Sequence, residues 1–305
     1  MSSSLATTTR AFLRAANGLG SRSAEALWAA SISLAGKAAR PPVERWTSSG
    51  RERVIVIAPH PDDETVGCVG TLIRHVRIGD AVTLAVVTDG SRSRSLGLDG
   101  SGMRVLRERE GRAAAERMGA HWRWMGLREG EWSDEDGRLA IRRALTEADP
   151  TVVYAPSNID FHPEHRRVAA LLAEILSELG QTPAVRIYAV QVPLTPLLTN
   201  LVHDISDLED ETRAVFNCYA SQRTNIACAF RSRRYAACFY GAIKWAEAFL
   251  ALPADVYAAL HRRSSANFRP LGIRAWNDPL AVFAGVRERI SWRLAAPGHA
   301  HCHES

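Results

Sequence analysis

The sequence predicts a doubly wound α/β fold, in which helices cover both faces of a mainly parallel sheet. The runs RVIVIA (53–58) and AVTLAVVTDG (81–90) are apolar on both faces of an extended chain, and a helical pattern follows each of them. Continuous apolar strands that alternate with helices are typical of parallel sheets buried on both sides. The 305 residues, 46% of them hydrophobic, are ample for such a core.

The elements are expected in regular alternation from residue 51. Runs rich in Val and Ile predict strands over 53–58, 81–90, 151–156 and 184–192, and alternating tryptophans predict one over 121–127. Apolar residues at helical spacing predict helices over 64–80, 104–120, 137–150, 164–180, 208–222 and 233–252. Beyond residue 252 we find no strong pattern.

Composition divides the chain into three regions. Residues 1–50 are rich in Ser and Thr, are basic, and end near the paired prolines Pro41 and Pro42, which are typical of a linker. We expect 1–50 to be an extension that packs on the domain or on a partner, with membrane contact as the less favoured alternative. The α/β domain is expected over 51–252, followed by a partly flexible C-terminal extension over 253–305.

Charge and cysteine content narrow the class of protein. The net charge is +5, but the positive charge is nearly all Arg and acids are interspersed with it, so no basic stripe indicates a nucleic-acid partner. Five cysteines without a CxxC pair fit a reducing compartment better than a disulfide framework, and we expect a cytoplasmic protein. No apolar run reaches the roughly 18 residues that a membrane span needs.

The segment APHPDDE, residues 58–64, places one histidine and three consecutive acids directly after the first predicted strand. In open α/β sheets, ligands bind outside the carboxyl ends of the strands. The acids would lie in the first turn of the next helix, where the helix dipole favours negative charge. A single Asp or Ser would be enough to cap that helix. Three acids after His-Pro therefore indicate a functional site.

A second cluster follows the strand predicted over 151–156. In SNIDFHPEH, His162 and His165 lie three residues apart at a helix start, so both can face one point on the same rim. His60, Asp63 and His165 would form a set of two histidines and one carboxylate that leaves a position open for water, as catalytic zinc requires. The ligand types do not fix the metal, because non-haem Fe²⁺ uses the same set.

These motifs resemble those of the LmbE-like, or PIG-L, deacetylases. APHPDDE closely matches the AHPDDE motif of that family, and HPEH is similar to its HPDH motif. TDG, RERE, YASQ and AEAF follow in family order, so the resemblance covers about residues 51–250. It implies a Rossmann-like fold and a zinc-dependent hydrolase of linear amides. The implied substrate is a small molecule that contains N-acetylglucosamine, from which the enzyme removes the N-acetyl group.

Carried over residue by residue, the resemblance implies that His60, Asp63 and His165 bind zinc, with Fe²⁺ as the alternative. It also implies that Asp62 is the general base and that His162 assists the transition state. The chemistry is consistent with these roles, because a metal ion acidifies water, a nearby carboxylate takes the proton, and a protonated histidine could stabilise an oxyanion. Support for these groups is expected from Glu64, Asp160 and Glu164.

Two features depart from the family pattern. Glu164 stands where the family usually has Asp, so the charge beside His162 sits on a longer arm. The loop TDGSRSRSLGLDGSG, residues 88–102, is longer and more basic than expected. Substrate contacts are predicted for Asp89, for Arg107, which matches a family arginine, and for two loop arginines that could instead be solvated charges. Those loop residues, Arg92 and Arg94, would bind an anionic portion of the substrate.

Several alternatives stay open. The chain could be a metal-dependent hydrolase of a phosphoester or of a non-sugar amide, or a non-catalytic family member, although the intact Asp62 disfavours the last. A nicotinamide dehydrogenase is disfavoured because no glycine-rich fingerprint follows the first strand. The acyl group, the remainder of the substrate and the oligomeric state, a homo-oligomer included, are not fixed by the sequence. The terminal GHAHCHES is not expected to be a physiological metal site.

Overall fold

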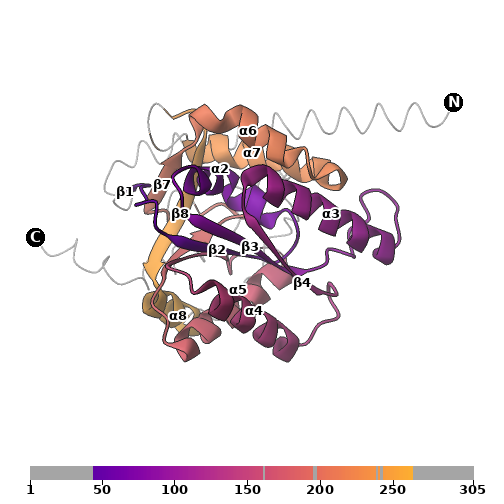
Figure 1. Cartoon of the computed structure of the whole chain (residues 1–305), viewed down its shortest axis with the longest axis horizontal. Coiled ribbons are helices and arrows are strands. Elements are labelled where there is room, and N and C mark those ends of the chain that lie inside the picture. Colours follow the sequence, from indigo (N-terminus) through magenta and orange to yellow (C-terminus); the bar gives the residue numbers. More distant parts are fainter. Residues whose placement is uncertain (1–43, 161, 195–197, 238–239, 241–242, 264–305) are drawn as a thin grey trace, which may run out of the picture.

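The computed structural model of the chain describes residues 44–160, 162–194, 198–237, 240 and 243–263. Most of the predicted N-terminal extension and the C-terminal His/Cys segment lie outside the described residues. Figure 1 shows three layers, in which one twisted sheet lies between two groups of helices. The domain therefore has the layered α/β architecture that the sequence predicts.

The sheet has eight strands in the order β1-β7-β8-β6-β5-β2-β3-β4. Its parallel part is β2 (Arg53–Ala58), β3 (Ala81–Thr88), β4 (His121–Leu127), β5 (Val152–Pro156) and β6 (Ala184–Tyr188). Beyond β6 follow β8 (Ala246–Pro253), antiparallel to both of its neighbours, then β7 (Leu201–Asp204) and the two-residue β1 (Glu44–Arg45). The mainly parallel, doubly wound sheet is confirmed. "Rossmann-like" describes only its parallel part.

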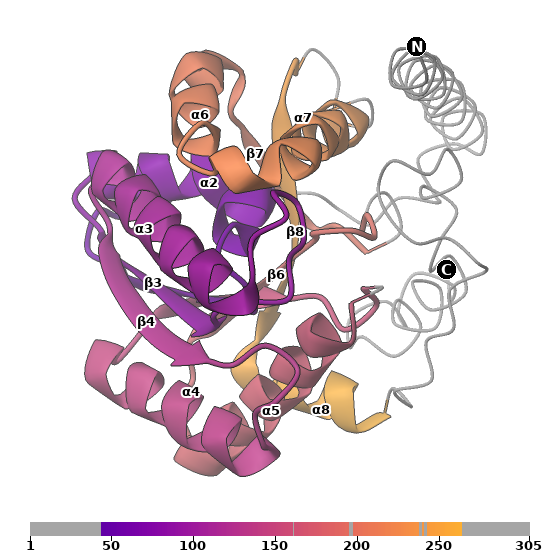
Figure 2. The ribbon, with the colours of Figure 1, turned by 90° about the vertical axis from the view of Figure 1, so that its right-hand side faces the viewer.

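Helices cover both faces of the sheet, as Figure 2 shows from the side. One layer consists of α2 (Asp63–Arg77), α3 (Gly100–Met118), α6 (Glu209–Phe216) and α7 (Arg223–Ala237). The other consists of α4 (Asp134–Ala148), α5 (Pro163–Leu179) and α8 (Ala254–Arg263). Two 3-10 turns, η2 (Ser206–Leu208) and η3 (Ala220–Gln222), flank α6.

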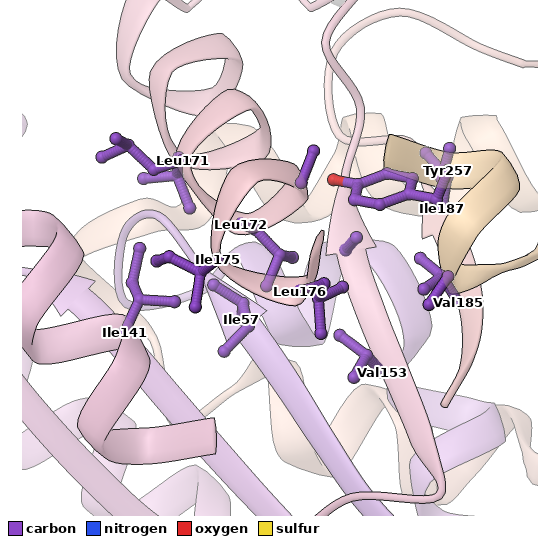
Figure 3. Close-up of a cluster of buried hydrophobic side chains, with 14 of the residues drawn as sticks. Ile57, Ile141, Val153, Leu171, Leu172, Ile175, Leu176, Val185, Ile187 and Tyr257 are labelled. Carbon is purple, nitrogen blue, oxygen red and sulfur yellow. The ribbon is translucent and has the colours of Figure 1, made fainter. Parts of the chain in front are cut away.

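Alternate residues of the central strands supply the two cores. On β2, Ile55 and Ile57 belong to the core beneath α4 and α5, whereas Val54 and Val56 belong to the core beneath α2, α3 and α6. Figure 3 shows Ile57 among Leu172, Leu176 and other apolar side chains of the α5 layer. Because each such side chain contributes about 1.5–3 kcal/mol on burial, the two cores fix the strands whose ends carry the polar motifs.

The structure corrects the prediction for the end of the domain. Residues 233–252 were expected to form one helix, but α7 ends at Ala237 and β8 occupies Ala246–Pro253. β8 lies between β6 and β7 with most of its residues buried, so its apolar run fits a central strand as well as a helix. The helix α8 was not predicted. β1 and α8 lie outside the predicted limits of 51 and 252, and each packs against the domain.

The helix α2 is broken at Cys68, where φ is −152° and the regular helix stops and starts again. The buried side chain of Glu247 on β8 accepts hydrogen bonds from the backbone N–H groups of Gly70 and Thr71, at 3.0 and 2.8 Å. It also pairs with the buried Arg233 of α7 at 2.5 Å. A single carboxylate thus caps the second half of α2 and joins it to α7 and the sheet.

Candidate metal centre and active site

The predicted clusters meet at the carboxyl ends of β2 and β5, which are neighbours in the sheet. The chain leaves β2 toward α2 in one helical layer and leaves β5 toward α5 in the other. Such a point, where the connections turn to opposite faces, opens the crevice in which doubly wound folds bind ligands. His60 and Asp63 enter it from the β2 side, and His165 enters it from the first turns of α5.

Three ligand atoms lie equally far apart in this crevice. His60 Nδ1 is 3.1 Å from Asp63 Oδ2 and 3.1 Å from His165 Nε2, and the last two atoms are also 3.1 Å apart. All three side chains are buried. Ligand atoms about 2.0–2.2 Å from one tetrahedral ion lie roughly 3.3 Å from each other. The residues therefore fit a single metal ion without rearrangement.

The charges of the cluster suit a cation. Burial lowers the pKa of His60, but its hydrogen bonds to Asp63 and Glu164 outweigh this and raise the pKa to about 9. Burial would raise the pKa of Asp63, yet the neighbouring His165 and His60 hold it well below its usual range. Two further groups in the described part of the chain overlap this set at His60 and could also hold a metal ion: His60 with His162 and His165, and His60 with Glu129 and Glu164.

Carboxylates contact the outer nitrogens of both histidines. His60 Nε2 lies 2.8 Å from Glu164 Oε2, and His165 Nδ1 makes an ion-pair contact of 3.2 Å with Asp160. A metal-binding histidine commonly has its second nitrogen held in this way, which fixes the ring. Glu164 also accepts hydrogen bonds from the N–H of Gly130 and from Trp132 Nε1. Its longer arm thus carries the carboxylate to His60 rather than to His162.

Asp62 has an unusual backbone conformation. It is the N-cap of α2, with φ at 113°, in the left-handed region that costs a non-glycine residue about 1–3 kcal/mol. Its N–H donates to Glu64 Oε2 at 3.1 Å, and Arg107 Nη2 donates to its Oδ1 at 2.8 Å. Tyr219 in turn donates to Glu64 at 2.5 Å, and burial raises the pKa of Glu64 to about 7. The side chains of Arg107 and Glu64 thus hold Asp62 in place.

His162 lies at the N-cap of α5, on the open side of the cluster. Its ring packs edge-on against His60, with 4.5 Å between centroids, and its side chain is 32% exposed. Nδ1 accepts a hydrogen bond from the N–H of Glu164, so the neutral ring carries its proton on Nε2. Burial, followed by the charges of His60 and His165, lowers the pKa of His162 to about 4.

The other predicted substrate residues take different positions. Asp89 is 1% exposed, and its Oδ1 accepts the N–H groups of Ser91 and Glu129, so that it shapes the turn after β3. Arg107 is 3% exposed and contacts Pro61 O and Asp62 from behind. Arg92 and Arg94 are exposed in the loop between β3 and α3.

Glu129 was not predicted from the sequence to belong to the site. This buried residue lies two positions beyond the end of β4, and its Oε1 lies 3.7 Å from His60 Nε2 and 4.0 Å from His162 Nε2. The signal was present, because Glu129 comes just after the end of a parallel strand, as the acids of APHPDDE do. Tyr219, from the YASQ segment, was likewise not assigned to the site.

Fold and site together define an α/β domain with a histidine–carboxylate centre that can hold a metal ion. Residues 55–176 match the family model for PIG-L, which is described as GlcNAc-PI de-N-acetylase. This match agrees with the resemblance to the PIG-L, or LmbE-like, deacetylases that the motifs indicated. No helix in the described part of the chain is long and apolar enough to cross a membrane.

Individual relatives show what this fold can support. The chain is 27% identical over 146 residues to a probable N-acetyl-alpha-D-glucosaminyl L-malate deacetylase 2 of Bacillus anthracis, across 45% of this chain and 65% of the relative. The match therefore spans just under two thirds of the relative's length. An N,N'-diacetylchitobiose deacetylase from Pyrococcus horikoshii shares the fold with a TM-score of 0.58 and 22% identity, over 67% of this chain and 85% of its own.

A 4-carboxy-2-hydroxymuconate hydratase from Pseudomonas putida KT2440 also shares the fold, with a TM-score of 0.53 and 19% identity. That likeness covers 65% of this chain and 95% of the hydratase. Because the fold is common to proteins named for different reactions, the reaction has to be argued from the residues of the site.

Proposed function

We propose that this protein is a zinc-dependent hydrolase that removes an N-acetyl, or related acyl, group from a small amino-sugar conjugate. The mutual 3.1 Å spacing of His60 Nδ1, Asp63 Oδ2 and His165 Nε2 carries this proposal. The family match and the deacetylase relatives support the type of reaction. A cytoplasmic location is proposed with it, on the cysteine content alone.

His60, Asp63 and His165 would hold the metal ion. Two imidazole nitrogens and one carboxylate oxygen suit Zn²⁺, and they suit Fe²⁺ as the alternative. A bound divalent ion polarises a carbonyl and makes water more acidic. Glu164 and Asp160 keep the two rings oriented through their outer nitrogens, so the three donor atoms remain in position before the ion arrives.

Asp62 would act as the general base. It follows Pro61 on the same tight turn as Asp63, and its carboxylate is held by Arg107 rather than by the ligand cluster. In this role it takes the proton of the attacking water and returns it to the nitrogen of the leaving amine. The contacts through Glu64 keep the backbone in the left-handed conformation that sets the direction of this carboxylate.

His162 would stabilise the oxyanion that develops on the amide carbonyl. We assign this to the neutral ring, whose Nε2–H can donate because Nδ1 already accepts the N–H of Glu164. This differs from the protonated histidine expected from the sequence, because burial, followed by the charges of His60 and His165, disfavours a positive charge on this ring. Glu129 Oε1, 4.0 Å from Nε2, would orient the same ring.

The proposal is tested by acetate release from a panel of N-acetylglucosaminides. The protein is stripped of metal with a chelator, reloaded with Zn²⁺ or anaerobically with Fe²⁺, and its metal content is measured. We expect one equivalent of metal and turnover that D62N lowers by about 100-fold or more. D134N, at the exposed start of α4, is the matched control and should retain activity. Bound metal without acetate release from any sugar would contradict the proposal.

A phosphoester hydrolase is the second candidate, because Arg92 and Arg94 are exposed close to the rim of the site. The same preparations should therefore be assayed with para-nitrophenyl phosphate. Phosphate release that depends on metal and on Asp62, without acetate release from the sugars, would favour this candidate.

A further inference from the structure

The loop between β3 and α3 has a surface unlike the rest of the domain. It projects beside the start of α3 (Figure 1). Five large hydrophobic side chains are exposed in the described part of the chain, and two of them, Leu96 and Leu98, lie in this loop at 54% and 43% exposure, while a third, Val105, lies near the start of α3 at 69%. Arg92 and Arg94, also exposed, precede them. Exposed apolar side chains grouped in this way mark binding surfaces more often than single ones do.

The loop borders an open hollow of about 670 Å³, lined by residues 91–94 and 97–100. Volumes of about 300–1,000 Å³ are typical of sites for small organic ligands. Arginines line the part of the hollow that follows β3, and Leu98 lines the part that precedes α3. We call this space the loop hollow.

The loop hollow begins at the rim of the metal centre. The N–H of Arg92 donates to Glu129 Oε2 at 3.0 Å, and the other carboxylate oxygen of Glu129 lies 3.7 Å from His60 Nε2. The guanidinium of Arg92 packs against Gly130, where an added Cβ would collide with it. Gln222, at the end of η3, donates to Ser93 Oγ at 3.1 Å and ties the loop to the body of the domain.

The charge of the loop hollow is unbalanced. Among the residues that the structure describes, neither Arg92 nor Arg94 forms an ion pair. The one carboxylate in the lining, Asp99, caps α3 by accepting the N–H of Gly102 at 2.7 Å and the hydroxyl of Ser101 at 3.0 Å. An anionic group therefore has two cationic partners near the rim, and hydrocarbon has apolar partners farther out.

We propose that the loop hollow binds an anion that carries a hydrocarbon chain, as the part of the substrate remote from the scissile amide. A phosphate or carboxylate would pair with Arg92 and Arg94, and the chain would lie on Leu98 in the lining and extend to the exposed Leu96 outside it. That this ligand belongs to the substrate rests on the proposed function. The concave shape and the direct contact with Glu129 at the metal centre argue for a substrate rather than for a membrane surface.

The test measures binding without turnover. Hexyl phosphate, which stays monomeric at the concentrations needed, is titrated calorimetrically into the full metal-loaded chain. Inorganic phosphate is titrated in parallel to account for phosphate that binds the metal ion, and hexyl glucoside is the uncharged control. We expect hexyl phosphate to bind at least about tenfold more tightly than either, and 0.5 M NaCl to weaken its binding.

Paired variants assign the binding to the loop. R92S/R94S should weaken hexyl phosphate binding by about tenfold. L96S/L98S should abolish the advantage of hexyl phosphate over inorganic phosphate. R143S and L139S alter equally exposed side chains on α4 and should change neither affinity. Equal losses in the loop and α4 variants, or no preference for hexyl phosphate, would overturn the proposal.

Two further arms separate the remaining outcomes. D62N should bind hexyl phosphate as the parent chain does, because Asp62 does not line the hollow. Binding that persists when no acetate is released from any sugar would support the ligand site while the proposed deacetylase fails. Acetate release without hexyl phosphate binding would overturn only the ligand site. Cosedimentation with phosphatidylglycerol vesicles in the absence of hexyl phosphate binding would assign the loop to a membrane and overturn the proposal.

Discussion

Glu247→Gln should destabilise the domain strongly, although it only replaces one buried carboxylate oxygen by an amide nitrogen. Glu247 accepts five hydrogen bonds, from Gly70 N, from Thr71 N and Oγ1, and from Arg233 Nε and Nη2. The amide of glutamine removes the negative charge and one acceptor, and leaves the guanidinium of Arg233 buried without its counter-charge. Breaking a buried pair in this way costs about 3–5 kcal/mol. That is a large share of a typical free energy of unfolding of about 5–15 kcal/mol.

Urea denaturation followed by circular dichroism measures this loss in E247Q. Because a domain of this size loses roughly 2–4 °C of melting temperature per kcal/mol, the melting temperature should fall by about 6–20 °C. The double variant R233M/E247Q should recover part of the stability, because it removes the guanidinium left without a counter-charge while the glutamine can still accept a hydrogen bond from an N–H group of α2. A loss below about 1 kcal/mol in E247Q, or a double variant weaker than E247Q, would refute the reasoning.

Three further predictions concern the core, the pH response and the site. Burial lowers the pKa of His203 to about 4, so on acidification the unfolded chain binds a proton at this histidine before the folded chain does. The contribution of His203 to the free energy of unfolding is therefore full above about pH 6.5 and falls by about 3 kcal/mol toward pH 4. H203N should reduce this pH dependence in urea titrations at several pH values. L172A should lower the free energy of unfolding by about 2–5 kcal/mol, because Leu172 is fully buried. L139A, on the exposed face of α4, should change it by less than about 0.5 kcal/mol, and equal effects of the two variants would contradict the packing described. E129Q should reduce kcat for acetate release by about tenfold, because it removes the carboxylate that orients His162, whereas E131Q, at an exposed neighbouring position, should leave kcat unchanged. A change in KM alone would argue against this role of Glu129.

The grouping of His60, Asp63 and His165 was predictable from the sequence because strand topology supplies the long-range information. Parallel strands bring their carboxyl ends to one rim, so polar residues directly after two such strands are brought together without knowledge of side-chain packing. The same argument applies to Glu129 after β4, which a search of every strand end would have found. The exposed loop positions of Arg92 and Arg94 also follow from local polarity.

Predictions that depended on burial by distant segments were less successful. The sequence gives no sign that Arg107 is enclosed behind Asp62, because that depends on how α3 packs against the turn after β2. The helix expected over 233–252 failed for a related reason: an apolar, alanine-containing run is compatible with either helix or strand. Its place between β6 and β7, where both neighbours offer backbone hydrogen bonds, selects the strand.

The left-handed backbone at Asp62 links folding to chemistry at a single residue. Glycine adopts φ of 113° at little cost, so D62G would relieve conformational energy that the present chain retains. D62G would, however, also leave the buried guanidinium of Arg107 without its counter-charge, at a cost of about 3–5 kcal/mol that exceeds the roughly 1–3 kcal/mol of the strained backbone. The carboxylate proposed as the base therefore also stabilises the strained turn, because it joins the start of α2 to α3 through Arg107.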